Sequence, residues 1–207
     1  MHRACLSFFV CVSPMGVTPA GGTAKNAALH INGGDLTLRN MALNVTAPGY
    51  AGIGGILFED GTLTLDGVNI EKVQNDGGLN GNQNGVALLQ YGGTLYVNNS
   101  TFKDFNKQAI SVFNGHAEIE NSHFEGAGNT SVNGQNGVQF GYRYPSTDPP
   151  NMAYAPTGKV NNCTFKNFWY ADPTNAVATA LLIFKPADVI CSGNTYKNCQ
   201  YEEHVVI

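Results

Sequence analysis

A short sequence unit recurs along this chain, and it limits the possible folds more than any other feature. The copies are LTLRNMAL (36–43), LTLDGVNI (63–70), LYVNNSTF (95–102), AEIENSHF (117–124), GKVNNCTF (158–165) and VICSGNTY (189–196). The first and third positions are mostly apolar, the fifth is always Asn or Gly, and the eighth is always large and apolar. Alternating apolar residues are typical of β-strands, and Asn and Gly readily adopt a positive φ. Each copy therefore predicts two short strands joined by a corner.

Another apolar segment precedes each copy, so that one unit contains three strands. These segments are AALHIN (27–32), GGILFED (54–60), GVALLQY (85–91), QAISVFN (108–114), GVQFGY (137–142) and TALLIFK (179–185). The shortest spacing between copies is 22 residues (from 95 to 117), and the longest is 41 (from 117 to 158). Units of this kind stack on one another, and insertions become loops. The sequence therefore predicts an all-β solenoid.

With its NNSTF, ENSHF and NNCTF turns and their preceding strands, the chain resembles the right-handed parallel β-helix (pectate-lyase-like) superfamily over about residues 26–199. The resemblance implies a single-stranded right-handed parallel β-helix of about six coils. It implies no single activity, because this fold hosts lyases, hydrolases, epimerases, tailspikes and adhesins. We place the domain at residues 23–207 and interpret residues 1–22 as a leader, either a signal peptide or an N-terminal cap.

The shared register predicts which side chains meet inside the solenoid. We expect one buried column of Leu38, Leu65, Val97, Ile119, Val160 and Cys191. The eighth position predicts a second column, an aromatic stack of Phe102, Phe124 and Phe165. At the corners we expect a ladder of side-chain amides from Asn99, Asn121 and Asn162.

Composition excludes several classes of function. Only 13% of residues are charged, the net charge is −4, and the 11 Lys and Arg residues form no basic cluster, which argues against nucleic acid as a partner. No apolar run reaches the roughly 18 residues of a membrane span. Three cysteines lie outside the leader, Cys163, Cys191 and Cys199, and no CxxC pair indicates a zinc site. We predict no cofactor and leave the disulfide state open.

The long insertions carry the residue types that a sugar-binding groove needs. The insertions 47–53, 74–84, 128–136 and 169–177 follow third strands and should lie on one side of the solenoid, whereas 141–157 separates a first strand from a second. Aromatic rings stack on sugars, and polar neighbours bind hydroxyl groups. We predict carbohydrate binding by the following residues: Tyr142, Tyr144, Tyr154, Trp169 and Tyr170. The alternative is that these rings only hold two long loops in place.

Residues for catalysis are harder to assign. The candidates are Arg143 or Lys185 as base or charge stabiliser, with Asp148 and Asp172 as acids or metal ligands. Aspartates occur singly at corners, without the i, i+2 spacing that a calcium site on one strand face would need. Ca²⁺ is therefore considered only for a lyase.

Three functions stay open at this point. The leading interpretation is a secreted or cell-surface module that displays loops for carbohydrate or host-surface binding. The alternatives are a polysaccharide lyase or epimerase acting on an acidic polysaccharide, and a structural solenoid that resembles a phage tailspike. The partner would be a polysaccharide or surface glycan, and the chain would be part of a longer protein or of a trimer.

Overall fold

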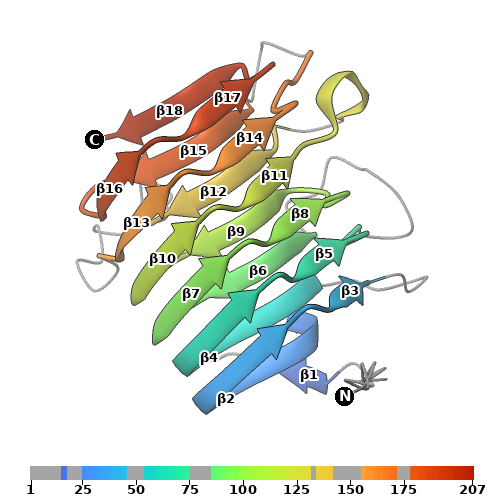
Figure 1. Cartoon of the computed structure of the whole chain (residues 1–207), viewed down its shortest axis with the longest axis vertical. Coiled ribbons are helices and arrows are strands. Elements are labelled where there is room, and N and C mark those ends of the chain that lie inside the picture. Colours follow the sequence, from blue (N-terminus) through green and yellow to red (C-terminus); the bar gives the residue numbers. More distant parts are fainter. Residues whose placement is uncertain are drawn as a thin grey trace, which may run out of the picture.

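The computed structural model describes residues 15–17, 25–45, 54–74, 85–131, 134–141, 155–171 and 178–207, which are mostly β-strand. Within these ranges the one helical turn is η2 (Gly128–Thr130), of the 3-10 type. Equivalent strands of successive coils lie side by side and run parallel, rising from the N-terminal end to the C-terminal end (Figure 1). The fold is therefore a parallel β-helix, as the repeat predicts.

Three faces surround one core. The first and second faces are halves of a 12-stranded sheet, joined because β2 (Lys25–Arg39) and β4 (Gly54–Asp66) run through both. The first face continues with β6 (Val86–Gln90), β9 (Gln108–Val112), β12 (Asn136–Phe140), β15 (Thr179–Phe184) and β18 (Tyr201–Val206). The second continues with β7 (Thr94–Asn98), β10 (His116–Glu120), β13 (Thr157–Asn161) and β16 (Asp188–Ser192).

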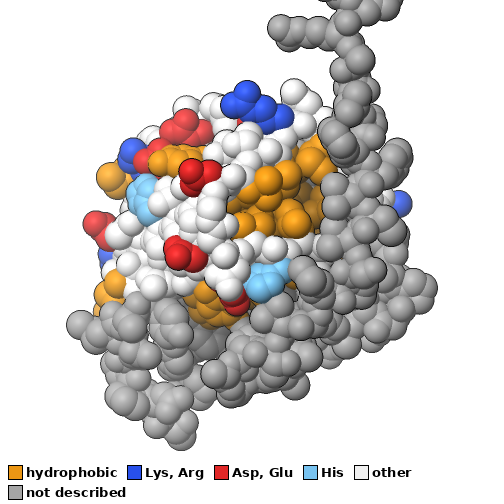
Figure 2. Space-filling model, turned by 90° about the horizontal axis from the view of Figure 1, so that it is seen from below, with side chains coloured by type: hydrophobic (Ala, Val, Ile, Leu, Met, Phe, Trp, Pro, Cys, Tyr) orange, Lys and Arg blue, Asp and Glu red, His pale blue; other side chains and the backbone are white. Residues whose placement is uncertain are grey.

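The third face is a separate six-stranded sheet. Its strands are β3 (Ala42–Asn44), β5 (Asn69–Glu71), β8 (Thr101–Lys103), β11 (His123–Glu125), β14 (Thr164–Lys166) and β17 (Thr195–Lys197). At the N-terminal end, β1 (Met15–Val17) pairs antiparallel with the start of β2. Figure 2 views that end and shows hydrophobic side chains gathered in its middle, where the interior of the solenoid lies.

The predicted apolar column is confirmed. Leu38, Leu65, Val97, Ile119, Val160 and Cys191 are consecutive register partners on the second face. The four middle members are at most 1% exposed, whereas Leu38 and Cys191 at the two ends are half-buried. Each coil thus covers the apolar side chains of its neighbours, which is how a solenoid builds a continuous core.

The aromatic column on the third face is confirmed as well. The ring centroids of Phe102 and Phe124 are 5.2 Å apart, and those of Phe124 and Phe165 are 4.9 Å apart. Tyr196 extends the stack at 5.4 Å from Phe165. All three phenylalanines are fully buried.

The corner between the second and third faces is made by residues with positive φ. The φ angles lie between 49° and 66° at Asn40, Gly67, Asn99, Asn121, Asn162 and Gly193. The amide ladder differs from the expected one: Asn121 donates to Asn98 at 3.0 Å, and Asn99 donates to Asp66 at 3.4 Å. These corner amides therefore bond to the last residue of a strand in the preceding coil rather than to one another.

Candidate functional site

The insertions join the first face at both of its edges. Those at 47–53, 74–84, 128–136 and 169–177 all fall between a strand of the third face and the next strand of the first face, as predicted. The insertion 141–157 begins at the opposite edge, where β12 leads toward β13. β9, β12 and β15 therefore lie between the two edges at which the insertions join the first face.

Polar side chains form this outer side of the first face. We call Gln108, Ser111, Asn136, Gln139 and Thr179 the polar floor. Their register partners include Val86 and Leu89, which belong to a small apolar cluster separate from the main core. The polar floor thus projects away from the interior, yet its members are only 0–9% exposed.

Gln139 holds the polar floor together. Its Oε1 accepts hydrogen bonds from the side-chain amides of Gln108 and Asn136, the latter at 3.2 Å. Its Nε2 donates to the carbonyl oxygen of Gly141 at 2.9 Å. Gly141 directly precedes Tyr142, the first aromatic residue of the insertion 141–157. The amide network is therefore hydrogen-bonded to the first residue of that insertion.

Two hydroxyl groups of the polar floor have no partner among the described residues. The Oγ of Ser111 and the Oγ1 of Thr179 are buried and make no hydrogen bond within that part of the chain. An unsatisfied buried polar group destabilises a fold by about 1–3 kcal/mol, and such a group in a native structure calls for an explanation. The hydroxyl groups of a sugar are donors and acceptors of the kind that both side chains lack.

Lys107 lies directly beside the polar floor. Its carbonyl oxygen accepts a hydrogen bond from the backbone N–H of Asn136 at 3.0 Å, and its Nζ donates to the carbonyl oxygen of Gly134 at 2.6 Å. Within the described part of the chain, no carboxylate forms an ion pair with it. Burial lowers the pKa of this ammonium from 10.5 to about 8. The site thus offers either a cation for a carboxylate or, at mildly alkaline pH, a neutral amine that acts as a base.

Most of the site residues predicted from the sequence lie outside the described residues. These are Tyr142, Arg143, Tyr144, Asp148, Tyr154 and Asp172, and they stay predictions. Trp169 is 41% exposed, which leaves its ring available, whereas Tyr170 packs against the core. Lys185 is exposed, and its Nζ donates to the carbonyl oxygen of Ala187 at 3.2 Å.

The polar floor was not among the predicted site residues. A signal for it exists in the sequence, because QAISVFN and GVQFGY place polar residues inside otherwise apolar strands. Ser111 and Gln139 fill the positions at which the units before and after carry Leu89 and Leu182. Replacement of an outward Leu by a polar residue in two successive coils is the feature to look for.

Comparisons with protein-family models, with curated proteins and with solved structures found no match for this chain. The described part of the chain contains no helix that is long and apolar enough to cross a membrane. In the same part of the chain, His, Cys, Asp and Glu side chains form no group of three or more that could hold a metal ion.

Proposed function

We propose that this chain is a secreted or cell-surface β-helix module, related to the pectate-lyase-like superfamily, that binds a polysaccharide or surface glycan on the outer side of its first face. The observation that carries the proposal is the pair of unpartnered hydroxyls, Ser111 and Thr179, within the amide network of the polar floor. Sugar hydroxyl groups donate and accept hydrogen bonds, so they complement such a surface.

Three kinds of group have separate roles in this proposal. The amides of the polar floor orient sugar hydroxyls, because Gln139 is itself fixed by Gln108 and Asn136. The exposed ring of Trp169 stacks on the CH groups of a sugar. Lys107 attracts the carboxylate of a uronate unit while it is protonated.

A lyase acting on an acidic polysaccharide is the second candidate, and Lys107 is the observation that favours it. An amine with a pKa of about 8 is deprotonated in a useful fraction of molecules near neutral pH. In a lyase it would remove the C5 proton of a uronate unit. The C4–O glycosidic bond would break as the C4=C5 double bond forms, and the departing oxygen would take a proton from water. Catalysis would release an unsaturated product that absorbs ultraviolet light.

The test measures both the glycan affinity and the stability of each variant. Ser111→Ala and Thr179→Val each remove an unpartnered hydroxyl, so the variants should be at least as stable as the original chain while glycan affinity falls about three- to tenfold. Affinity is measured by calorimetry against a panel of neutral and uronate oligosaccharides, and stability by thermal unfolding. Thr164→Val, on the third face, is the matched control and should bind normally.

Unchanged affinity in both variants would refute the proposed site. An increase in ultraviolet absorbance with a uronate polymer, abolished in Lys107→Met and retained in Lys185→Met, would favour the lyase.

A further inference from the structure

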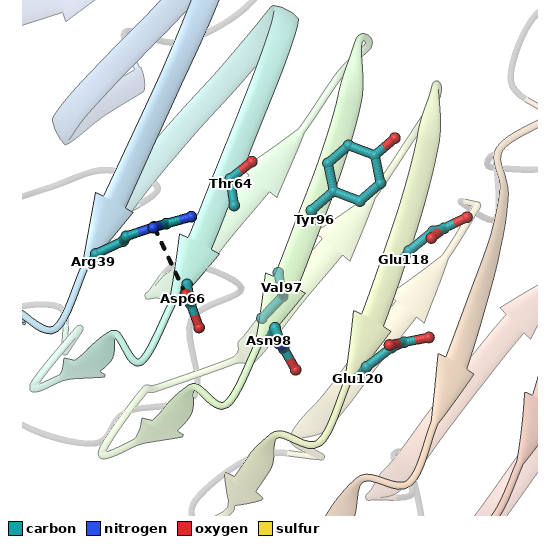
Figure 3. A pocket seen from close by; sticks show the side chains of 8 residues that line it. All are labelled: Arg39, Thr64, Asp66, Tyr96, Val97, Asn98, Glu118 and Glu120. Atoms are coloured by element: carbon teal, nitrogen blue, oxygen red, sulfur yellow. Dashed lines mark ion pairs between the residues drawn. The ribbon is translucent and has the colours of Figure 1, made fainter.

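The second face carries a hollow of about 290 Å³ on its outer side. Its lining comes from four consecutive coils: Arg39, Thr64, Asp66, Tyr96, Val97, Asn98, Glu118 and Glu120. In Figure 3, Tyr96 projects from β7, with Glu118 and Glu120 of β10 on one side and the Arg39–Asp66 ion pair on the other. This hollow is on a different face from the polar floor.

The ring of Tyr96 provides the exposed apolar surface of the hollow. It is 40% exposed, and its register partners are Thr64 and Glu118. An exposed aromatic ring in the middle of a polar sheet contributes little to folding. The same ring with polar groups on both sides is suited to stacking on a flat ligand that carries hydroxyl groups at its edge.

Two of the carboxylates are held in position by neighbours. Glu118 lies 3.0 Å from the Nζ of Lys159 and 3.2 Å from the Nε2 of His116, and these contacts lower its pKa. Asp66 lies 3.7 Å from the Nε of Arg39 and accepts from the amide of Asn99. Acceptors that are already oriented lose little entropy when a ligand binds, which favours affinity.

Glu120 is the exception, because its carboxylate takes part in none of the ion pairs of the described residues. The register partner that Asp66 and Glu120 share on β7 is Asn98, two residues along the strand from Tyr96. Neighbouring strands are about 4.8 Å apart, so Asp66 and Glu120 lie on strands separated by about 10 Å. That width accommodates one pyranose ring with a hydrogen bond on either side.

We propose that this hollow binds one neutral pyranose unit of a glycan by stacking on Tyr96. The charges around the hollow favour a neutral sugar. Three carboxylates and one Arg line the hollow, so a uronate unit would bring its carboxylate close to like charges. A basic peptide is a poorer fit, because Asp66 and Glu118 already have cationic partners, and of the three carboxylates Glu120 alone lies outside the ion pairs of the described residues. This inference rests on the proposed function in that both require the chain to bind glycans, but the two sites share no residue.

The experiment titrates the whole chain with neutral hexasaccharides (glucan, mannan, galactan), with a hexauronate and with tetralysine. Tyr96→Ala should weaken neutral-sugar binding about tenfold, whereas Tyr96→Phe, which keeps the ring, should stay within about threefold. Ile190→Ala removes a more exposed apolar side chain from β16, on the same face but outside the hollow, and should have no effect. Circular dichroism and thermal unfolding confirm that each variant is folded.

Equal binding by Tyr96→Ala and the original chain overturns the inference, as does absence of neutral-sugar binding. Tyr96-dependent binding of the hexauronate or tetralysine alone overturns it too. Loss of binding in Ser111→Ala and Thr179→Val, but not in Tyr96→Ala, would leave the proposed function standing and remove this second site. The opposite pattern would retain the second site and remove the first.

Discussion

Phe124 lies between two other rings in the interior column of the third face. Its centroid is 5.2 Å from that of Phe102 and 4.9 Å from that of Phe165, and the side chain is fully buried. Truncation to Ala removes contacts on both sides and leaves a cavity. We expect Phe124→Ala to lower the free energy of unfolding by about 3–5 kcal/mol, measured by urea titration.

Trp169→Ala is the matched control, because that ring is larger but 41% exposed. It should cost less than about 1 kcal/mol. A loss from Phe124→Ala no greater than that from Trp169→Ala would contradict the aromatic column.

Because Lys107 is partly buried, we expect the free energy of unfolding to depend on pH. In the folded chain its pKa is lowered from 10.5 to about 8 by burial, so the unfolded chain binds more protons between these two values. The contribution of Lys107 to the free energy of unfolding therefore rises as pH increases through this interval and is lost as pH falls through about 8.

We expect the original chain to gain stability relative to Lys107→Met between about pH 7 and pH 10, by an amount on the order of 2 kcal/mol. Urea unfolding of both proteins across this range measures the difference. A difference that is constant with pH, or that shrinks as pH rises, would contradict a desolvated ammonium at this position.

At the residue scale, the sequence predicts the core better than the site. Phe102 and Phe124 are recognisable because one large apolar residue recurs at a fixed position, and burial of such a residue needs only its own coil and its neighbours. Ser111 and Gln139 are different. A polar residue inside an apolar strand does not reveal whether its partners lie nearby, and its bonding depends on a side chain from another coil.

The corner is the element that turns the second face into the third. Asn121 has φ 49° there, while the equivalent Gly67 and Gly193 have φ 66° and 65°. Gly adopts this conformation without steric cost, whereas a Cβ-bearing residue other than Asn or Asp pays about 1–2 kcal/mol. We expect Asn121→Ala to lower the free energy of unfolding by about 1 kcal/mol and Asn121→Gly by less than about 0.5 kcal/mol.

The control for this pair is Asn69→Ala, at an exposed position of β5. It should be nearly neutral. If Asn121→Gly proved as damaging as Asn121→Ala, the side-chain bond to Asn98 would outweigh the backbone conformation.

At the scale of elements, the repeat predicts strands and corners because each Asn or Gly column marks the same turn in every coil. The side-chain hydrogen bonds between coils cannot be predicted in this way. The amides of Asn99 and Asn121 reach the preceding strand end rather than each other, which depends on side-chain direction at positive φ. The repeat fixes which residues share a corner but not which of them bond.

At the scale of the whole molecule, the solenoid is predictable because each coil contacts only its neighbours, so one unit implies the rest. The site is less predictable, since it combines strands of the repeat with insertions that follow no repeat. The sequence predicts which strands the insertions connect, and the order of the elements agrees. The polar floor forms only when β9, β12 and β15 lie side by side.

Hydrogen–deuterium exchange with and without a bound oligosaccharide tests the central claim, glycan binding on the first face, most directly. With the tightest ligand of the panel, peptides covering 134–157 and 169–184 should exchange more slowly, because they contain β12, β15 and the adjoining insertions. Peptides from the third face should be unchanged. Binding without slower exchange in 134–157 and 169–184, or with protection confined to 94–103 and 116–125 on the second and third faces, would contradict the claim.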